Sequence, residues 1–463
     1  MKKTLLALFL LTMTIVFTGC SLFKTDKASD EPKLPTTATE LDAMAEEKLC
    51  ALDSYSATET TSGNFTVNDV YFEFLSTTEV LVSGQNSDNY ADETETSLVT
   101  SYKEKNDLDS VTEAIYLTEG FTSGTWYRNS TVGQSGSNIK SEISKENYLS
   151  FRKEREEKKL AEIGNATPAS SELERLENGG WKGTLTDFDP EYTSNYLYSL
   201  LGDDVIFETS VEDMTVTIIT TEDFVYESIA IDFELVNPDG AKKTIGRISC
   251  KMEFSDVNST YISPVDLSEY SPIDDIRAIY AVEDVISEAK DIESGKIDFL
   301  FEDTKPIPGY IPGTTTVREE STLTFSKSNG ISYNLTSVSD DIKFLQTYSE
   351  GKVTAEIFKN DLSYGKTTTD STDEEQKIVL DSFIDYISFD PLLVYDVKIP
   401  EEGTYLVSLH PNDSQKIYGT TVKIELEITV TNGKLSKYLC TIGKSHSSSP
   451  YKGTKIEAIY EWD

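Results

Sequence analysis

Apolar residues at every second position recur along this chain and predict strands that bury one face. The clearest run alternates Val422, Ile424, Leu426, Ile428 and Val430 with polar or charged residues. Successive side chains of a strand point to opposite faces, so this pattern is typical of antiparallel strands with one face packed and one in water. Similar runs lie at 70–74, 214–218, 229–235, 248–254, 297–301, 323–325, 395–399, 405–409 and 456–462.

Other segments carry their apolar residues at helical spacing. Residues 39–52 and the segment from Ile279 to Ala289 each present one apolar stripe, which predicts two amphipathic helices. Further helices are predicted at 192–201 and 374–387. Residues 145–163 are rich in strong helix formers but have only a weak apolar stripe. We therefore expect a solvent-exposed surface helix there.

The order of these elements repeats along the chain. Each half runs from a helix through several strands, a polar break and a further helix into a meander of strands. A stretch without hydrophobic periodicity, 261–275, separates the halves. We therefore predict an α+β fold in which two tandem curved antiparallel sheets, or half-barrels, are each covered by one or two helices. The predicted domains are 39–260 and 276–463, joined by the 261–275 linker.

The N-terminus has a different pattern. Two lysines, an apolar run from Leu5 to Phe17 and then Thr18-Gly19-Cys20 are typical of a secretory signal. The segment resembles the bacterial lipoprotein signal, in which small residues precede a cysteine. The resemblance implies a signal peptide at 1–19 and a diacylglyceryl thioether on Cys20. A transmembrane helix is the alternative, although the apolar run is shorter than the roughly 20 residues that a span needs.

The lipid would place the protein at the extracytoplasmic face of the cell membrane. Two acyl chains suffice for stable attachment, whereas one holds only marginally. After Cys20, the polar segment 20–38 has two prolines and no hydrophobic period, so we interpret it as a flexible tether. The membrane, through the lipid on Cys20, is thus the one partner that the sequence indicates directly.

Composition narrows the other partners. The chain has 81 acidic and 41 basic residues, a net charge of −40. Cleavage of the signal would remove Lys2 and Lys3 and no acid, which makes the mature charge −42. A surface this acidic repels nucleic acid and anionic lipid headgroups, so nucleic-acid binding is excluded. The 25 tyrosines and 20 phenylalanines argue against disorder, because such a chain can bury a core.

The cysteines and histidines offer little chemistry. After Cys20 only Cys50, Cys250 and Cys440 remain, so at most one disulfide can form among them. Cys250 lies on the apolar side of its strand and is predicted to be a buried free thiol, with a Cys50–Cys250 bridge as the alternative. Each half places one cysteine, Cys250 or Cys440, after an asparagine-containing turn, so we expect the two to be structurally equivalent. His410 and His446 lie in polar, turn-like segments and are expected at the surface.

Motifs for catalysis are missing from the sequence. There is no zinc-binding HExxH or CxxC pair, no phosphate-binding loop and no nucleophile elbow. The acidic residues are too numerous for any pair of them to be informative. We therefore expect a protein that is not an enzyme and that holds no cofactor and no metal.

The predicted helices are too few to cover the predicted sheets, which leaves room for a ligand. One helix covers a strip about 10 Å wide, or roughly two strand spacings, so two helices leave much of a wide sheet bare. A lipobox, then a helix and a curled antiparallel sheet resembles the LolA/LolB/LppX-like half-barrel lipoproteins, above all the tandem-domain versions of Gram-positive bacteria. The resemblance implies an apolar concavity and the carriage of lipid or lipoprotein, but it has no motif that names ligand-binding residues. The alternative is a structural or protein-interaction module with filled cores and an unknown partner.

Overall fold

The computed structural model shows the protein as two compact units. The first comprises 1–133 with 142–269, and the second comprises 134–141 with 270–463. Cys20 and most of the tether lie outside the described residues, and the domain limits drawn from the sequence stay predictions. The structure describes residues 34–67, 70–104, 111–133, 135–164, 168–201, 210–236, 244–290, 292–306, 314–327, 330–339, 342–373, 375–377, 380, 389–410, 422–444 and 453–462.

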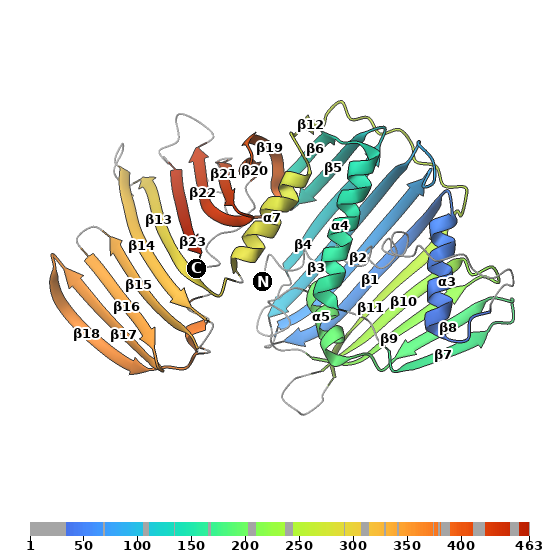
Figure 1. Ribbon diagram of the computed structural model, residues 1–463, viewed down its shortest axis with the longest axis horizontal. Helices are drawn as coiled ribbons and strands as arrows, with labels where there is room; N and C mark the ends of the chain where they lie inside the picture. The colour runs from blue at the N-terminus through green and yellow to red at the C-terminus, as the bar shows by residue number, and fades with distance from the viewer. Residues whose placement is uncertain are drawn as a thin grey trace. The chain divides into compact units, whose positions relative to one another are not determined.

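The chain forms two large sheets that carry helices, as Figure 1 shows. The helices are α3 (Ala38–Ala51), α4 (Lys145–Ile163), α5 (Pro190–Leu201) and α7 (Arg277–Lys290), with a short 3-10 helix η2 (Pro391–Leu393). The strands of the first sheet are β1 (Tyr55–Val67), β2 (Val70–Ser83), β3 (Ala91–Glu104), β4 (Val111–Thr122), β5 (Thr125–Val132), β6 (Ser135–Glu142), β7 (Ser170–Arg175), β8 (Trp181–Thr186), β9 (Ser210–Thr220), β10 (Tyr226–Val236), β11 (Thr244–Ser255) and β12 (Ser271–Pro272). Those of the second sheet are β13 (Ser294–Pro306), β14 (Thr314–Ser326), β15 (Ser332–Ser339), β16 (Ile342–Ser349), β17 (Lys352–Lys359), β18 (Leu362–Asp370), β19 (Val394–Glu401), β20 (Thr404–Leu409), β21 (Val422–Thr431), β22 (Lys434–Lys444) and β23 (Gly453–Trp462).

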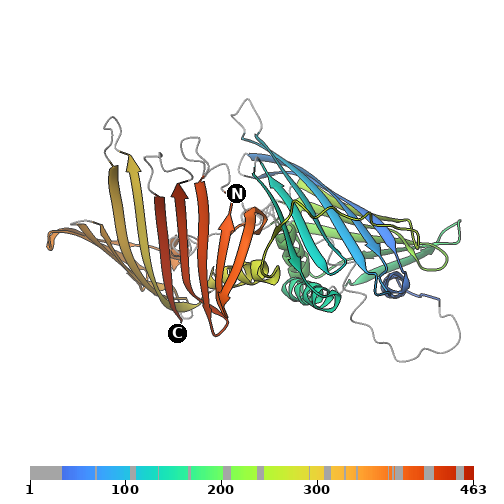
Figure 2. The ribbon, with the colours of Figure 1, turned by 90° about the horizontal axis from the view of Figure 1, so that it is seen from above.

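The two sheets share one strand order. The 12-stranded sheet runs β12-β6-β5-β4-β3-β2-β1-β11-β10-β9-β8-β7, and the 11-stranded sheet runs β18-β17-β16-β15-β14-β13-β23-β22-β21-β20-β19. In the first sheet β1 pairs antiparallel with β11, and in the second β13 pairs antiparallel with β23. The other strands follow in numerical order on both sides of this central pair, and the short strand β12 adds to β6 in parallel. Strand β12 and all of strand β6 except Glu142 fall within the bounds of the second unit. The sheets are curved and do not close, which confirms the predicted α+β class (Figures 1 and 2). Origin by duplication stays a prediction.

Side-chain alternation accounts for the strands. On β10, Ile229, Ile231, Phe233 and Leu235 are buried while the residues between them are half-buried or exposed, as the sequence pattern predicts. The predicted stripe of α7 is confirmed as well, because Ile279, Val282, Ile286 and Ala289 are all at most 4% exposed. Burial of these faces, at about 25 cal/mol per Å² of apolar surface, is the main force that holds each helix on its sheet.

The first helix, α3, sits close against its sheet. Thr37 caps its N-terminus by accepting a hydrogen bond from the backbone N–H of Glu40. Its Ala38 faces Gly183 on β8, where a Cβ atom on the glycine would lie 2.8 Å from the Cβ of Ala38. Only glycine permits this approach of the helix to the strand. The helix predicted at 39–52 is confirmed by α3, with both ends shifted by one residue.

Glu46 gives α3 a pH-dependent contribution to stability. Burial, and secondarily the charge of Asp42, raises the pKa of Glu46 to about 7. A carboxyl whose folded-state pKa is raised stabilises the fold when protonated, and this contribution is lost as the pH rises from about 4.5 through 7. We expect Glu46→Gln to raise the free energy of unfolding by about 1 kcal/mol at pH 8 and to change it little at pH 4.5. Urea unfolding at both pH values measures this.

Glu47→Gln is the matched control, because Glu47 is the exposed neighbour of Glu46 on the same helix. A stabilisation by Glu46→Gln that is equal at the two pH values, or that Glu47→Gln reproduces, would contradict the prediction.

Two expectations need correction. Helix α4 is not simply solvent-exposed, because Tyr148 and Ile163 are each 3% exposed. Long side chains, rather than a regular apolar stripe, bury its face. Cys250 and Cys440 are both buried free thiols, as predicted for Cys250, but they are not equivalent. Cys250 lies on β11, which pairs with the first strand of its sheet, whereas Cys440 lies on β22, one strand further from the corresponding pair of β13 and β23.

Candidate functional site

The second sheet has an inner face that is covered at one end and open at the other. We call inner the face that holds the buried side chains Ile297 on β13 and Leu323 on β14, both 0% exposed. Strand register continues this face across the sheet, since Ile297 pairs with Tyr460 and Leu323 with Leu335. Every second residue along each strand from these positions belongs to the same face.

At the open end the inner face carries exposed apolar side chains. Val317 is 47% exposed, Ile342 46% and Ile357 47%. The phenylalanines beside them are half-buried. A folded protein that leaves so many large apolar groups on one side of a sheet presents a surface suited to an apolar partner. We call this surface the inner apolar patch, and it consists of Phe299, Phe301, Val317, Ile342, Phe344, Ile357 and Ile456.

The patch has two apolar sides, which we call its walls, and the strands between them carry polar side chains next to Val317. Ile456 pairs with Phe301 on one side, and Phe344 pairs with Ile357 on the other. The two strands between the walls, β14 and β15, place serines and Glu319 on the same face. Neighbouring strands are about 4.8 Å apart, so the walls of β13 and β16 are separated by about 14 Å along the sheet. An extended chain of methylene groups that crosses the patch from one wall to the other fits this distance.

The other end of this face is closed by a hydrogen-bonded segment. The Tyr348 hydroxyl donates to Oδ1 of Asp373, and the Tyr333 hydroxyl donates to Oε1 of Gln376 at 2.6 Å. Leu380 of the same segment is 1% exposed. These contacts fix the start of the helix predicted at 374–387, most of which lies outside the described residues. The open and closed ends are therefore set by where this segment docks.

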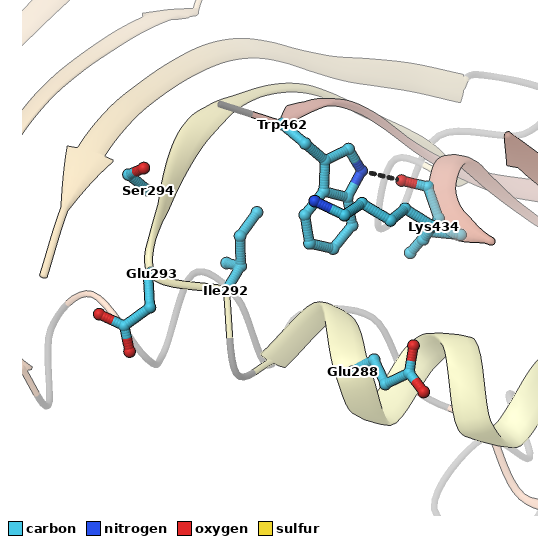
Figure 3. Close-up of a pocket in the computed structure, with 7 residues that line it drawn as sticks. Glu288, Ile292, Glu293, Ser294, Lys434 and Trp462 are labelled. Atoms are coloured by element: carbon cyan, nitrogen blue, oxygen red, sulfur yellow. Dashed lines mark hydrogen bonds between the residues drawn. The ribbon is translucent and has the colours of Figure 1, made fainter. Parts of the chain in front are cut away.

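A separate pocket of about 330 Å³ lies beside the end of α7 (Figure 3). Its main wall is Trp462, whose indole N–H donates to the backbone oxygen of Leu435 at 2.5 Å. The Lys434 ammonium lies 5.0 Å from the centre of the Trp462 ring. A cation of the chain itself therefore already makes a cation–π contact with the face of the ring. Glu288 and Glu293 complete the lining. Because Lys434 covers the aromatic face, this pocket is a weaker candidate for an apolar ligand.

The first unit buries polar side chains among the apolar residues of its interior. On the buried face of its sheet, Glu59, Thr61, Ser76, Thr78 and Thr96 are each at most 5% exposed. The Thr61 hydroxyl donates to Oε1 of Glu59 at 2.8 Å. The large apolar side chains of the same face, such as Phe72 and Phe74, are at most 6% exposed. We therefore place the candidate apolar surface on the second sheet, where such side chains are exposed.

A buried carboxylate ties α4 to this sheet. Asp92 on β3 is 3% exposed and accepts hydrogen bonds from the hydroxyls of Tyr90 (2.5 Å) and Tyr148 (2.9 Å). It also accepts from the backbone N–H of Phe121 at 3.0 Å and forms an ion pair with Arg152 of α4. Burial and the charge of Asp92 raise the pKa of the Tyr148 hydroxyl well above its ordinary value. This is a structural centre rather than a reactive one.

A cavity of about 380 Å³ opens beside this centre. It is lined by Tyr90, Arg152 and Glu156 together with residues from the β2–β3 turn. Burial raises the pKa of Glu156 to about 7, against the opposing effects of Arg152 and Lys159. Charged side chains of both signs meet the apolar side chains of Val82 and Leu149 here, so the lining does not favour one chemical class of ligand.

The residues singled out in the sequence are mostly distant from these features. Cys20 and His446 lie outside the described residues. His410 is half-buried, with its ring 4.5 Å from that of Tyr395, and burial lowers the pKa of its imidazole. Cys250 is a free thiol, so the predicted alternative of a Cys50–Cys250 bridge is excluded. Within the described ranges no group of three or more histidine, cysteine, aspartate or glutamate side chains is placed to hold a metal ion.

None of the helices that the structure describes is both long enough and apolar enough to cross a bilayer.

Comparison with known proteins gives only remote similarity. No family model and no curated protein sequence matches the chain. A DUF1329 family protein from Desulfovibrio piger is 11% identical over 41% of this chain and 93% of its own, with a TM-score of 0.16. A structure described as an outer membrane lipoprotein-sorting protein domain from Vibrio parahaemolyticus is 10% identical, covers 40% of this chain and 92% of its own, and has a TM-score of 0.17. One described as an outer membrane protein from Bacteroides fragilis is 10% identical over 91% and 99%, with a TM-score of 0.19. TM-scores this low carry no argument about fold or function.

Proposed function

We propose that this protein is a non-catalytic lipoprotein, held at the extracytoplasmic face of the cell membrane by a lipid on Cys20, that binds an apolar ligand on its second sheet. The inner apolar patch is the observation that carries the proposal. Three of its β-branched side chains are nearly half exposed although they point to the face that buries Ile297 and Leu323. We propose an acyl chain as the ligand, because it can cover both walls at once.

The energetics allow weak binding. Each methylene group removed from water contributes about 0.8 kcal/mol, so a twelve-carbon chain supplies roughly 8–10 kcal/mol before costs. Association itself costs an estimated 4 kcal/mol or more. The difference of about 4–6 kcal/mol or less corresponds to dissociation constants from about 40 micromolar to about 1 millimolar, or weaker. Such affinity suits a carrier or sensor that releases its ligand.

Native mass spectrometry of residues 34–463, titrated with dodecyl maltoside, tests the proposal. We expect one detergent molecule to remain bound per chain at concentrations below micelle formation. Absence of any bound detergent, and of any lipid that copurifies with the protein from bacteria, would contradict apolar ligand binding.

Lipidation at Cys20 makes a separate prediction. In a bacterial host, Cys20→Ala is expected to move the protein from the membrane fraction to the soluble fraction or leave it as uncleaved precursor, because the thioether attaches the acyl chains. Fractionation and intact mass measure both outcomes. Ser21→Ala, next to the modified residue, is the matched control and is expected to stay in the membrane fraction.

Reduction with dithiothreitol sharpens the result, because a thioether survives it and a disulfide does not. Recovery of Cys20 as a free thiol after reduction, without added lipid mass, would overturn the anchor.

Strand β18 favours a second function, a protein-interaction module. All nine of its residues are exposed, and it ends the second sheet in the strand order. Leu362 is 67% exposed and Tyr364 72%. An exposed edge of this kind can accept an additional strand from a partner protein. This alternative is preferred if titration shows no ligand on the inner apolar patch.

A further inference from the structure

We propose that the ligand of the inner apolar patch is an amphiphile whose polar end is a hydrogen-bond donor of positive charge, such as an alkylammonium group, and that Glu319 selects it. This inference rests on the proposed function and adds the chemistry of the ligand's headgroup. Its basis is a carboxylate that lies among apolar side chains on the inner face.

Strand register places Glu319 inside the patch. On β13 it pairs with Phe301, a member of the patch, and on β15 it pairs with Ser339. Val317, two residues earlier on the same strand, belongs to the patch as well. A ligand whose alkyl chain covers both walls and whose polar end lies at the β13 wall therefore brings that end within reach of this carboxylate.

The contacts of Glu319 leave it open to a ligand. Its Oε1 atom accepts a hydrogen bond from the Ser337 hydroxyl at 2.6 Å and a longer one from Ser321 at 3.5 Å. Among the described residues it forms no ion pair. Hydroxyl donors hold a carboxylate in place without neutralising it. The side chain is exposed, so a ligand reaches it directly.

Among the charged residues of the inner face whose side chains the structure describes, Glu319 is the acid that a ligand on the patch reaches. Asp303, on the same face, is 3% exposed and accepts from the Thr454 hydroxyl, so it is shielded from the patch. Lys359 pairs with Ile342 at the far wall, three strands from Glu319, or about 14 Å. A headgroup near Glu319 therefore meets a negative charge first, and the acidity of the whole chain adds to the repulsion of anions.

A headgroup series with one alkyl chain tests the inference. Dodecylammonium, dodecyl maltoside and dodecanoate are titrated by calorimetry into residues 34–463, each below micelle formation. We expect dodecylammonium to bind about tenfold more tightly than dodecyl maltoside, and dodecanoate to bind more weakly than both. Glu319→Gln is expected to remove the tenfold preference and to leave dodecyl maltoside binding within about twofold.

Glu320→Gln controls for net charge. Glu320 is the next residue on β14, points to the outer face and pairs with Arg318 at 2.7 Å. The Glu320→Gln substitution changes the total charge by the same amount as Glu319→Gln. The Glu320→Gln variant is expected to retain the preference for dodecylammonium. If dodecyl maltoside binds but Glu319→Gln leaves the preference unchanged, or Glu320→Gln abolishes it equally, the headgroup inference is wrong while ligand binding stands. If none of the three probes binds, the proposed function itself fails.

Discussion

Replacing Asp92 with alanine is expected to lower the free energy of unfolding of the first unit by about 3–5 kcal/mol, the largest effect on stability that we predict. The carboxylate is 3% exposed and has four partners, which are the Tyr90 and Tyr148 hydroxyls, the Phe121 N–H and Arg152. Alanine removes this acceptor from all four groups, and Arg152 keeps its ion pair with Glu156 at 3.9 Å. Much of the loss comes from the two tyrosine hydroxyls, the Phe121 N–H and the weakened pairing of Arg152, because donors in largely buried positions are costly when they lose an acceptor.

Tryptophan fluorescence during urea unfolding measures this change. Trp126 and Trp181 belong to the first unit and Trp462 to the second, so a Trp462→Phe background reports on the first unit alone. Asp223→Ala, at an exposed turn of the same unit, is the matched control and is expected to change stability by at most about 0.5 kcal/mol. A loss below 1 kcal/mol for Asp92→Ala would show that the carboxylate does not hold α4 to the sheet.

The importance of Asp92 could have been inferred only in part from the sequence. It occupies the same alternate positions on β3 as Leu98, which is 1% exposed, so strand periodicity already places an acid on the buried face. Its partners could not be predicted, because Tyr148 and Arg152 are more than 50 residues away in a helix whose composition suggested a solvent-exposed surface. Buried tyrosine and arginine side chains leave no apolar stripe to detect.

Alternation predicts which face of a strand packs, but not how far along the strand the packing extends. Leu323 and Val317 lie on the same face of β14, yet one is 0% exposed and the other 47%. The two residues differ in whether another segment of the chain covers them. The segment that begins at Asp373 docks over one end of the inner face, and its contacts depend on hydroxyls and an amide rather than on a pattern visible in the sequence. The open end, and with it the candidate site, could only be found in the structure.

Matching the two halves by turn motifs failed for a related reason. An asparagine-containing turn precedes both Cys250 and Cys440, but turns recur after almost every strand of a meander. Counting strands from the central pair of each sheet, β1 with β11 and β13 with β23, shows the two cysteines one strand apart. The sequence analysis thus addressed the repeated order of elements along the chain, whereas the order of strands within each sheet and the equivalence of single residues needed the structure.

Ile357→Asp is expected to weaken the binding of dodecyl maltoside at least tenfold, the largest effect on ligand binding that we predict. Ile357 forms part of one wall of the inner apolar patch and pairs with Phe344. A bound alkyl chain would cover the new carboxylate, and burying a charge without a partner costs several kcal/mol. Because each 1.4 kcal/mol is a factor of ten, even a partly relieved penalty gives the expected change. Calorimetric titration below micelle formation measures it.

Val338→Asp isolates the effect of the face on which the charge is placed. Val338 is 39% exposed against 47% for Ile357, is likewise β-branched, and lies on β15 of the same sheet. Its position alternates with that of the buried Leu335, so it points to the outer face. Both variants add one charge and one poor strand former, so their effects on folding should be similar. Loss of binding in Ile357→Asp with binding retained in Val338→Asp places the ligand on the inner face, whereas equal binding by both would remove the inner apolar patch as the site.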